Sequence, residues 1–185
     1  EQFKETVERG VFQEVTKEEL ENYAGPVNYI SIVEAFKQGP HCTTPLRLCM
    51  NSSLKFRGIS LNDILMKGPS ALTDIMNISL GFRSYPVAIV KDISKFYNSV
   101  ASVDRDQHLR RVLHRPGGQG EVKIYKTTTV NFGDKPAGCV AHSALRGTAV
   151  NFKQVDPEAS RKIIEDSYVD DTITVGVGRV VPRIT

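Results

Sequence analysis

Tryptophan is absent from this 185-residue chain, and cysteine is scarce. The three cysteines, Cys42, Cys49 and Cys139, are odd in number and form no CxxC pair, which argues against a disulfide scaffold. His41 lies beside Cys42, but no second Cys/His pair follows at a zinc-binding spacing. The cysteines are therefore expected to be reduced and mostly buried, as in intracellular proteins.

Long apolar runs and a strong charge of one sign are also missing. No stretch approaches the roughly 18 apolar residues that a membrane-spanning helix needs, and the opening EQFKETVERG lacks signal-peptide character. Lys and Arg number 24 against 21 Asp and Glu, a formal net charge of +3. This slight basic excess is compatible with nucleic acid, but equally with a protein that has no polyanionic partner. Because the chain does not begin with Met, we expect a segment of a longer polypeptide.

The hydrophobic pattern predicts a mixed α+β protein in which helices are grouped between antiparallel strand pairs. Residues 1–25 have a helical rhythm, with Thr16 and Glu19 in a capping-box pattern, and residues 108–114 suit a strand or a short helix. Ser60 with Asp63 can cap the helix near 59–66, and Pro157 lies near the first position of the helix over 156–166. Strands are expected over 27–36, 44–50, 85–94 and 122–130, helices near 59–66, 70–82, 136–150 and 156–166, and a hairpin over 167–178.

Carboxylates carry the clearest chemistry in this sequence. Asp92 follows the apolar run AIV at the end of a predicted strand, and Asp170 and Asp171 lie at the predicted tip of the 167–178 hairpin. If these strands are neighbours in one sheet, the three carboxylates converge at one edge. Such oxygen ligands suit magnesium, and two ions about 3.5–4 Å apart activate a 3′-hydroxyl and stabilise a leaving pyrophosphate. Taken alone, an Asp-Asp pair is more commonly a turn former.

Four segments carry a more specific signal: TTPLRLCMNSSLKFRGISLNDILMKGP, VAIVKDISKFYNSV, VNFGDKPAGCVAHSAL and YVDD, in that order. They resemble the fingers segment and polymerase motifs A, B and C of reverse transcriptases, most closely those of the BEL/Pao class of long-terminal-repeat retrotransposons. The resemblance covers most of the chain, from residue 25 to residue 175. Four ordered matches are far more specific than any one of them.

The resemblance implies an RNA-directed DNA polymerase with a right-hand polymerase fold of the α+β class. Fingers would occupy residues 1–85 and palm residues 86–185, with an antiparallel palm sheet, helices on one face, and truncation after the YVDD hairpin before any thumb or RNase H domain. The reaction would be two-metal transfer of a nucleotide from a dNTP to a primer 3′-hydroxyl, with Mg²⁺ or Mn²⁺. Implied partners are an RNA or DNA template with primer, dNTP and other domains of a polyprotein, in the cytoplasm or retroelement particles and without a membrane.

Residue by residue, the resemblance makes Asp92, Asp170 and Asp171 the catalytic acids and metal ligands. Tyr97 would lie under the sugar and exclude a 2′-hydroxyl, and the alternative is a core aromatic. Arg47 would grip the triphosphate, because a guanidinium pairs two phosphate oxygens at once. Without the resemblance, Arg47 is a surface charge on a strand.

Two further pairs of residues follow from the same resemblance. Phe132 and Gly133 match the start of motif B in the nucleotide site, where a glycine lets the backbone pass close to template or nucleotide. Lys55 and Arg57 are predicted to contact template phosphates, or alternatively to be solvated charges.

Departures from the family pattern keep a rival interpretation open. Asn51 stands where many relatives carry Asp, and Lys135 precedes Pro136 where Ser-Pro is commoner. The rival is a catalytically inactive retroelement remnant that binds nucleic acid or protein, if it acts at all. Retention of all three acids opposes that rival, because buried carboxylates are costly once no metal binds them. An unrelated α+β domain with a chance YVDD is the third alternative.

Overall fold

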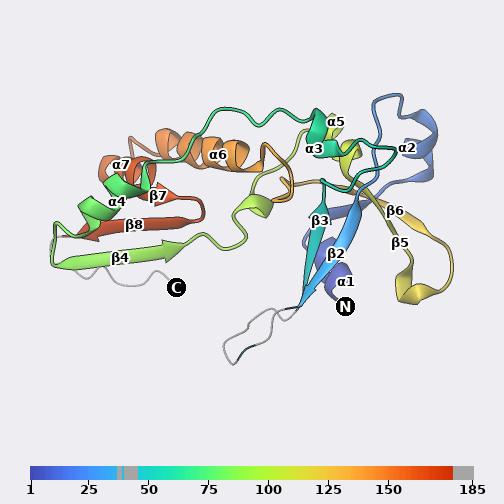
Figure 1. Cartoon of the computed structure of the whole chain (residues 1–185), viewed down its shortest axis with the longest axis horizontal. Helices are drawn as coiled ribbons and strands as arrows, with labels where there is room; N and C mark the ends of the chain where they lie inside the picture. The colour runs from blue at the N-terminus through green and yellow to red at the C-terminus, as the bar shows by residue number, and fades with distance from the viewer. Residues whose placement is uncertain (37–38, 40–45, 177–185) are drawn as a thin grey trace. The chain divides into compact units, whose positions relative to one another are not determined.

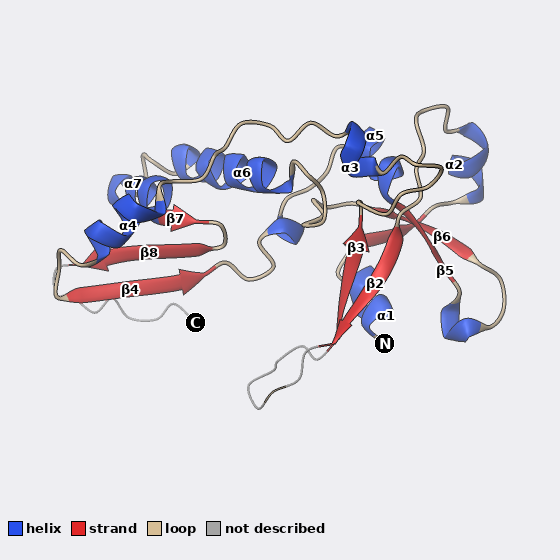
Figure 2. Cartoon of the chain, in the orientation of Figure 1, coloured by secondary structure: helices blue, strands red, loops and turns tan. Residues whose placement is uncertain are grey.

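The computed structural model describes residues 1–36, 39 and 46–176 (Figure 1). These residues form helices and small antiparallel sheets, so the predicted α+β class is confirmed (Figure 2). The chain divides into two compact units, each assembled from two stretches: residues 1–67 with 97–137, and residues 68–96 with 138–185. We call these the first and the second unit and describe each by itself.

The first unit contains a three-stranded antiparallel sheet in the order β1-β6-β5. Its strands are β1 (Phe12–Glu14), β5 (Arg111–His114) and β6 (Lys123–Thr127). The sequence predicted no strand before residue 27, and β1 corrects that prediction. Its three residues are too few for a periodic signal, and it exists because Phe12, 2% exposed, pairs with Thr127 of β6.

The helical elements of the first unit are all short. The predicted caps are present: the Thr16 hydroxyl accepts from the Glu19 N–H at 3.1 Å, and Ser60 and Asp63 form a reciprocal capping box. Residues 108–114, left open between strand and helix, form a 3-10 turn followed directly by β5. These elements are α1 (Gln2–Glu8), α2 (Lys17–Asn22), α3 (Leu61–Ile64), α5 (Asp104–Gln107), and the 3-10 turns η1 (Tyr97–Ser99), η2 (His108–Arg110) and η3 (Pro116–Gly118).

A two-stranded hairpin, β2 (Ser31–Phe36) with β3 (Leu46–Asn51), completes the first unit and confirms the two strands predicted there. Most of the predicted break between them lies outside the described residues. Just before β2, Tyr29 forms a parallel bridge with Arg111, and the Ile30 N–H donates to the Arg111 carbonyl at 2.9 Å. The hairpin is thereby joined to the edge of the three-stranded sheet.

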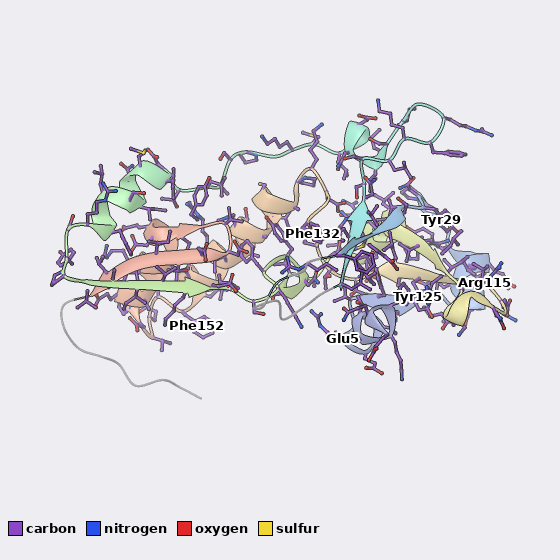
Figure 3. The ribbon with its side chains drawn as sticks, turned by 60° about the horizontal axis from the view of Figure 1, so that its bottom comes forward. Glu5, Tyr29, Arg115, Tyr125, Phe132 and Phe152 are labelled. Carbon is purple, nitrogen blue, oxygen red and sulfur yellow. The ribbon has the colours of Figure 1, made fainter. Side chains whose placement is uncertain are left out.

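The core of the first unit lies where this hairpin, the sheet and α1 meet. Phe3 of α1 stacks on Phe12 with ring centroids 5.0 Å apart and meets Tyr125, which is labelled in Figure 3, edge-on at 4.9 Å. Each large apolar side chain buried in this way contributes roughly 1.5–3 kcal/mol. The buried cluster comprises Phe12, Ile30, Met50, Leu61, Val112 and Tyr125.

A buried polar cluster lies beside this core. His108, 2% exposed, donates from Nε2 to Glu19 at 3.1 Å, and its Nδ1 accepts from the Arg111 guanidinium at 2.8 Å. Tyr23 stacks on the imidazole, with centroids 3.7 Å apart. Burial, with the positive charges of Arg111 and Lys126, lowers the pKa of His108. The hydrogen bonds and this shift together favour the neutral imidazole.

The second unit contains a three-stranded antiparallel sheet in the order β4-β8-β7. Asp74 caps α4 and Asp156 caps α7, with Pro157 in the first turn of α7 as the sequence predicted. The Ser160 hydroxyl of α7 donates to the Ala149 carbonyl of α6 at 2.7 Å and joins these two helices. The elements are α4 (Ile75–Phe82), β4 (Val87–Asp92), α6 (Ala137–Asn151, with Gly138 onward in this unit), α7 (Pro157–Asp166), β7 (Ser167–Tyr168) and β8 (Asp171–Gly176).

Candidate functional site

Two of the three predicted acids face each other across neighbouring strands of the second unit. Asp92 is the last residue of β4 and pairs with Asp171, the first residue of β8. Directly opposed residues of an antiparallel pair point to the same face, with Cβ atoms about 4.5–5.5 Å apart. The convergence expected from the sequence is therefore present for these two carboxylates.

Asp170 lies in the turn that joins β7 to β8. The sequence predicted that Asp170 and Asp171 together form the hairpin tip, but the turn consists of Val169 and Asp170, and Asp171 already belongs to β8. The Asp170 carbonyl accepts from the Ile93 N–H at 2.7 Å. This bond fixes the turn against the residue that follows Asp92.

The backbone of this turn is strained. Val169 has a φ of 55°, in the left-handed region that a β-branched residue adopts only at a cost of about 1–2 kcal/mol. Lys95, three residues after Asp92, has a φ of 57°. Such conformations persist where the surrounding structure enforces them, and they concentrate at functional sites.

The charges of the three acids are not neutralised by basic side chains within the part of the chain that the structure describes. None of the ion pairs found there involves Asp92, Asp170 or Asp171. Like charges directly opposed in a sheet repel each other. A cation between Asp92 and Asp171 would remove that repulsion, so the pair fits a divalent metal ion chemically.

The number of protein ligands determines which kind of metal ion this site can hold. Among the described residues, no group of three or more His, Cys, Asp and Glu side chains is arranged to hold one ion. Magnesium keeps several waters and commonly takes one or two carboxylates together with substrate phosphates. Asp92 and Asp171 supply two such carboxylates and leave the other coordination positions to water and phosphates. A site with a full set of protein ligands would leave no such positions.

Two predicted nucleotide-pocket residues lie together in the first unit. The ring of Tyr97, in η1, lies 6.5 Å from that of Phe132, with the planes tilted by 50°. Phe132, whose side chain is labelled in Figure 3, has an exposed fraction of 48%. Its exposure leaves an aromatic surface available beside Tyr97.

Gly133 has an intramolecular role that the sequence did not indicate. A Cβ atom at this position would lie 2.3 Å from the carbonyl oxygen of Met50, at the end of β3. The Gly133 carbonyl also accepts from the Asn62 side chain at 2.9 Å. From the sequence, the Gly133 backbone was expected to approach a nucleotide or template closely. In the structure, the close approach on this side of Gly133 is to β3.

A buried ion pair fixes the motif around Gly133. Asp134, 5% exposed, pairs with Arg110, 7% exposed, and accepts from the Ser52 hydroxyl at 2.5 Å and from the Asn131 amide at 3.1 Å. Arg110 also donates to the Asp106 carbonyl at 2.9 Å. This network anchors residues 131–134 to the end of β3 and leaves Phe132 exposed.

The remaining predicted residues lie on β3 and the loop that follows it. Arg47 is exposed in β3, opposite Ala35. Lys55 is 3.9 Å from Asp63, and both side chains are largely exposed. The guanidinium of Arg57 lies 5.4 Å from the centre of the Phe56 ring, and Phe56 is 76% exposed. Contact of these cations with phosphates remains a prediction.

His142 is a residue near the acids that the sequence analysis did not select. It lies in α6 and is 2% exposed, and no residue that the structure describes forms a hydrogen bond with its Nε2. Burial and the charge of Arg146 lower its pKa, and the charge of Asp170 acts in the opposite direction. The available signal was a single imidazole among the small residues of AGCVAHSAL.

Comparisons with known proteins add no family assignment. No protein-family model matches this chain, and no curated protein matches it. Among the residues that the structure describes, no helix has the length and apolar character required to cross a membrane.

Proposed function

We propose that this chain is the fingers and palm part of an RNA-directed DNA polymerase with a right-hand fold, of the BEL/Pao retrotransposon class. The observation that carries the proposal is the pairing of Asp92 with Asp171, beside a strained turn that presents Asp170. Two acids in register at a strand end, without an ion-pair partner among the described residues, suit the binding of a cation better than the capping of a turn.

The chemistry is transfer of a nucleotide from a dNTP to the 3′-hydroxyl of a primer, with release of pyrophosphate. Two bound Mg²⁺ or Mn²⁺ ions would activate the hydroxyl and neutralise charge on the phosphates. Asp92 and Asp171 would hold these ions, and Asp170 would complete the acidic set from the turn. Positioning by these residues, rather than covalent chemistry, supplies the rate enhancement.

The nucleotide-binding residues of this proposal are those that the sequence resemblance implies. Tyr97 follows Asp92 by five residues and provides the steric gate against a 2′-hydroxyl, with Phe132 as its aromatic neighbour. The exposed guanidinium of Arg47 pairs with the triphosphate. Lys55 and Arg57 contact the template backbone, and such phosphate contacts make binding salt-dependent.

The proposed partners are a primed RNA or DNA template, dNTP, and the other domains of a polyprotein, in an intracellular setting. The class of the polymerase rests on the four ordered motifs. The described geometry of Asp92, Asp171 and the Tyr97–Phe132 pair supports the assignment of roles within them.

A catalytically inactive remnant that binds nucleic acid or protein is the second candidate. Two departures from the family pattern favour it, Asn51 in place of Asp and Lys135 in place of Ser before Pro136. It predicts template binding without nucleotide incorporation.

Primer extension on an RNA template separates the two candidates. The full-length natural protein is incubated with primed RNA, dNTPs and Mg²⁺, beside the variants Asp92→Asn and Asp170→Asn. Extension that is lost in both variants supports the polymerase, and Tyr97→Val is then expected to incorporate ribonucleotides more readily. Absence of extension by a folded protein that still binds template supports the remnant.

A further inference from the structure

Arg110 is a buried cation of the first unit whose guanidinium holds three partners in place. It pairs with the Asp134 carboxylate and donates to the Ser102 hydroxyl at 3.3 Å and to the Asp106 carbonyl at 2.9 Å. The N–H donors of a guanidinium lie in one rigid plane, so its partners are held at set positions. Arg110 therefore fixes Ser102 relative to Asp134.

The segments on which these two partners lie carry the aromatic pair of the first unit. Residues 100–102 pair with residues 128–130 through backbone hydrogen bonds of 2.8 and 2.9 Å and an antiparallel bridge. Tyr97 precedes the first stretch and Phe132 follows the second, so both rings lie beyond the same end of this pairing. Their positions therefore depend on further contacts.

Phe132 projects from a tight turn that Asp134 closes. The Asp134 N–H donates to the Asn131 carbonyl at 3.0 Å, and the Asp134 carboxylate accepts from the Asn131 amide at 3.1 Å. The Gly133 N–H donates to the Asn131 side-chain oxygen at 3.3 Å. Both ends of the turn are buried, whereas Phe132 is exposed. The anchoring of Asp134 to Arg110 therefore sets the direction in which Phe132 projects.

The chemistry of the Arg110–Asp134 contact indicates what it contributes. Because two charges lose their hydration on burial, a buried ion pair is often no more stabilising than apolar residues of the same volume. It differs from apolar packing in being directional, because each N–H points to a fixed acceptor. The pair therefore specifies the geometry of the 131–134 turn more than it stabilises the core.

We infer that Arg110 is a positioning residue that sets the spacing of Tyr97 and Phe132 and, through it, the preference for deoxyribonucleotides. The inference rests on the proposed function, in which Tyr97 excludes a 2′-hydroxyl. Arg110 is buried, so it acts through the two rings, whose centroids lie 6.5 Å apart, and not on the nucleotide. Exclusion of a single oxygen atom requires an accurately placed gate, and a displacement of about 1 Å can change a rate by up to 10²-fold.

A double substitution removes the contact without leaving a buried charge. Arg110→Met with Asp134→Asn loses both charges, and Asn keeps the side-chain oxygen that accepts from Ser52 and Asn131. Loss of both partners of a buried pair is tolerated far better than loss of one. The urea midpoint of the double variant should therefore stay close to that of the unaltered protein. Tyr97→Val, which removes the gate itself, is the control for nucleotide selection.

Two readouts are measured on the full-length natural protein. The first is the nuclear Overhauser contact between the rings of Tyr97 and Phe132, and the second is the ratio of kcat/KM for dATP to that for ATP on a primed RNA template. We expect the double variant to lose the ring contact and to lower the ratio about tenfold. An unchanged ring contact, or an unchanged ratio in the folded double variant, overturns the inference.

Failure of the proposed function would be recognised separately. If the unaltered protein incorporates neither nucleotide, the polymerase assignment fails, and the ring contact still decides whether Arg110 positions the aromatic pair. If Tyr97→Val leaves the ratio unchanged, the gate itself is wrongly assigned.

Ser102→Ala replaces the double variant if that protein does not fold. It removes one hydrogen bond of Arg110 at a partly buried position and leaves the ion pair with Asp134 in place. A fall of about threefold in the dATP to ATP ratio is expected from the loss of one such bond. An unchanged ratio in this variant overturns the inference.

Discussion

Substitution of Gly133 by alanine provides a direct test of why a glycine stands in this motif. The added Cβ would lie 2.3 Å from the Met50 carbonyl oxygen and 3.3 Å from the Asn131 amide nitrogen. The first distance is far shorter than an ordinary contact between such atoms, and the second is near the lower limit. The nearer atom belongs to the backbone of β3. Met50 is part of the buried core, so neither side can move without disturbing packing.

The expected cost follows from this geometry. Overpacking a well-ordered core typically costs about 1–3 kcal/mol, and a clash with backbone belongs at the upper end, about 3 kcal/mol. For a protein of this length each kcal/mol lowers the melting temperature by about 2–4 °C, so a decrease of roughly 6–12 °C is expected.

Gly138→Ala is the matched control. Gly138 lies in α6, and a Cβ there would meet nothing within 4 Å. Replacing a glycine within a helix by alanine stabilises by roughly 0.5–1 kcal/mol, because the unfolded chain loses freedom. The same chemical change is therefore predicted to have opposite signs at the two positions.

Urea unfolding followed by far-ultraviolet circular dichroism measures both effects, since the chain has no Trp to report by fluorescence. If Gly133→Ala keeps full stability, the steric argument is wrong. If the variant keeps its stability but loses dNTP binding, the glycine is required for nucleotide binding, as the sequence alone suggested.

Three further predictions use the same unfolding assay. The pKa of His108 is lower in the folded protein, so the unfolded chain takes up the proton first as pH falls. The stabilising contribution of the neutral His108 is therefore present above pH ~6.5 and is lost as pH falls toward the lower folded pKa. Greater stability at pH 5.5 than at pH 7.5 would contradict this prediction. Asp134→Ala leaves Arg110 buried without its partner and should cost roughly 3–5 kcal/mol; a change below about 1 kcal/mol would show the pair to be solvated. Asp92→Asn removes the repulsion with Asp171 and should stabilise the metal-free protein by about 0.3 kcal/mol. Mg²⁺ should abolish this gain in stability. A gain of the same size with and without Mg²⁺ would show that the repulsion is not linked to cation binding.

Local sequence was sufficient for most elements. The caps at Thr16 and Ser60 and the helices over 136–150 and 156–166 were predicted, and the structure has them within a residue or two. These features depend on contacts between residues close in the chain, which is why the sequence reveals them. The three-residue β1 was missed because its existence depends on β6, more than a hundred residues later.

The candidate acids were also found from sequence, because Asp92 ends a predicted apolar strand and Asp170 and Asp171 lie at a predicted hairpin tip. What the sequence left conditional was whether those strands are neighbours. The pairing of β4 with β8, and the register that sets Asp92 against Asp171, are long-range properties of the sheet. A shift of one residue would have sent the two carboxylates to opposite faces.

The sequence by itself therefore determined the α+β class, the positions of most elements and the residue types available for metal and phosphate chemistry. Tertiary structure alone decided which of them meet. It placed Tyr97 beside Phe132, closed the Gly133 backbone against Met50, and buried His142 in the unit of the acids, its Nε2 unpaired among the described residues. Each of these depends on packing between segments distant in the chain, where burial and close contact, rather than local preference, set the free energy.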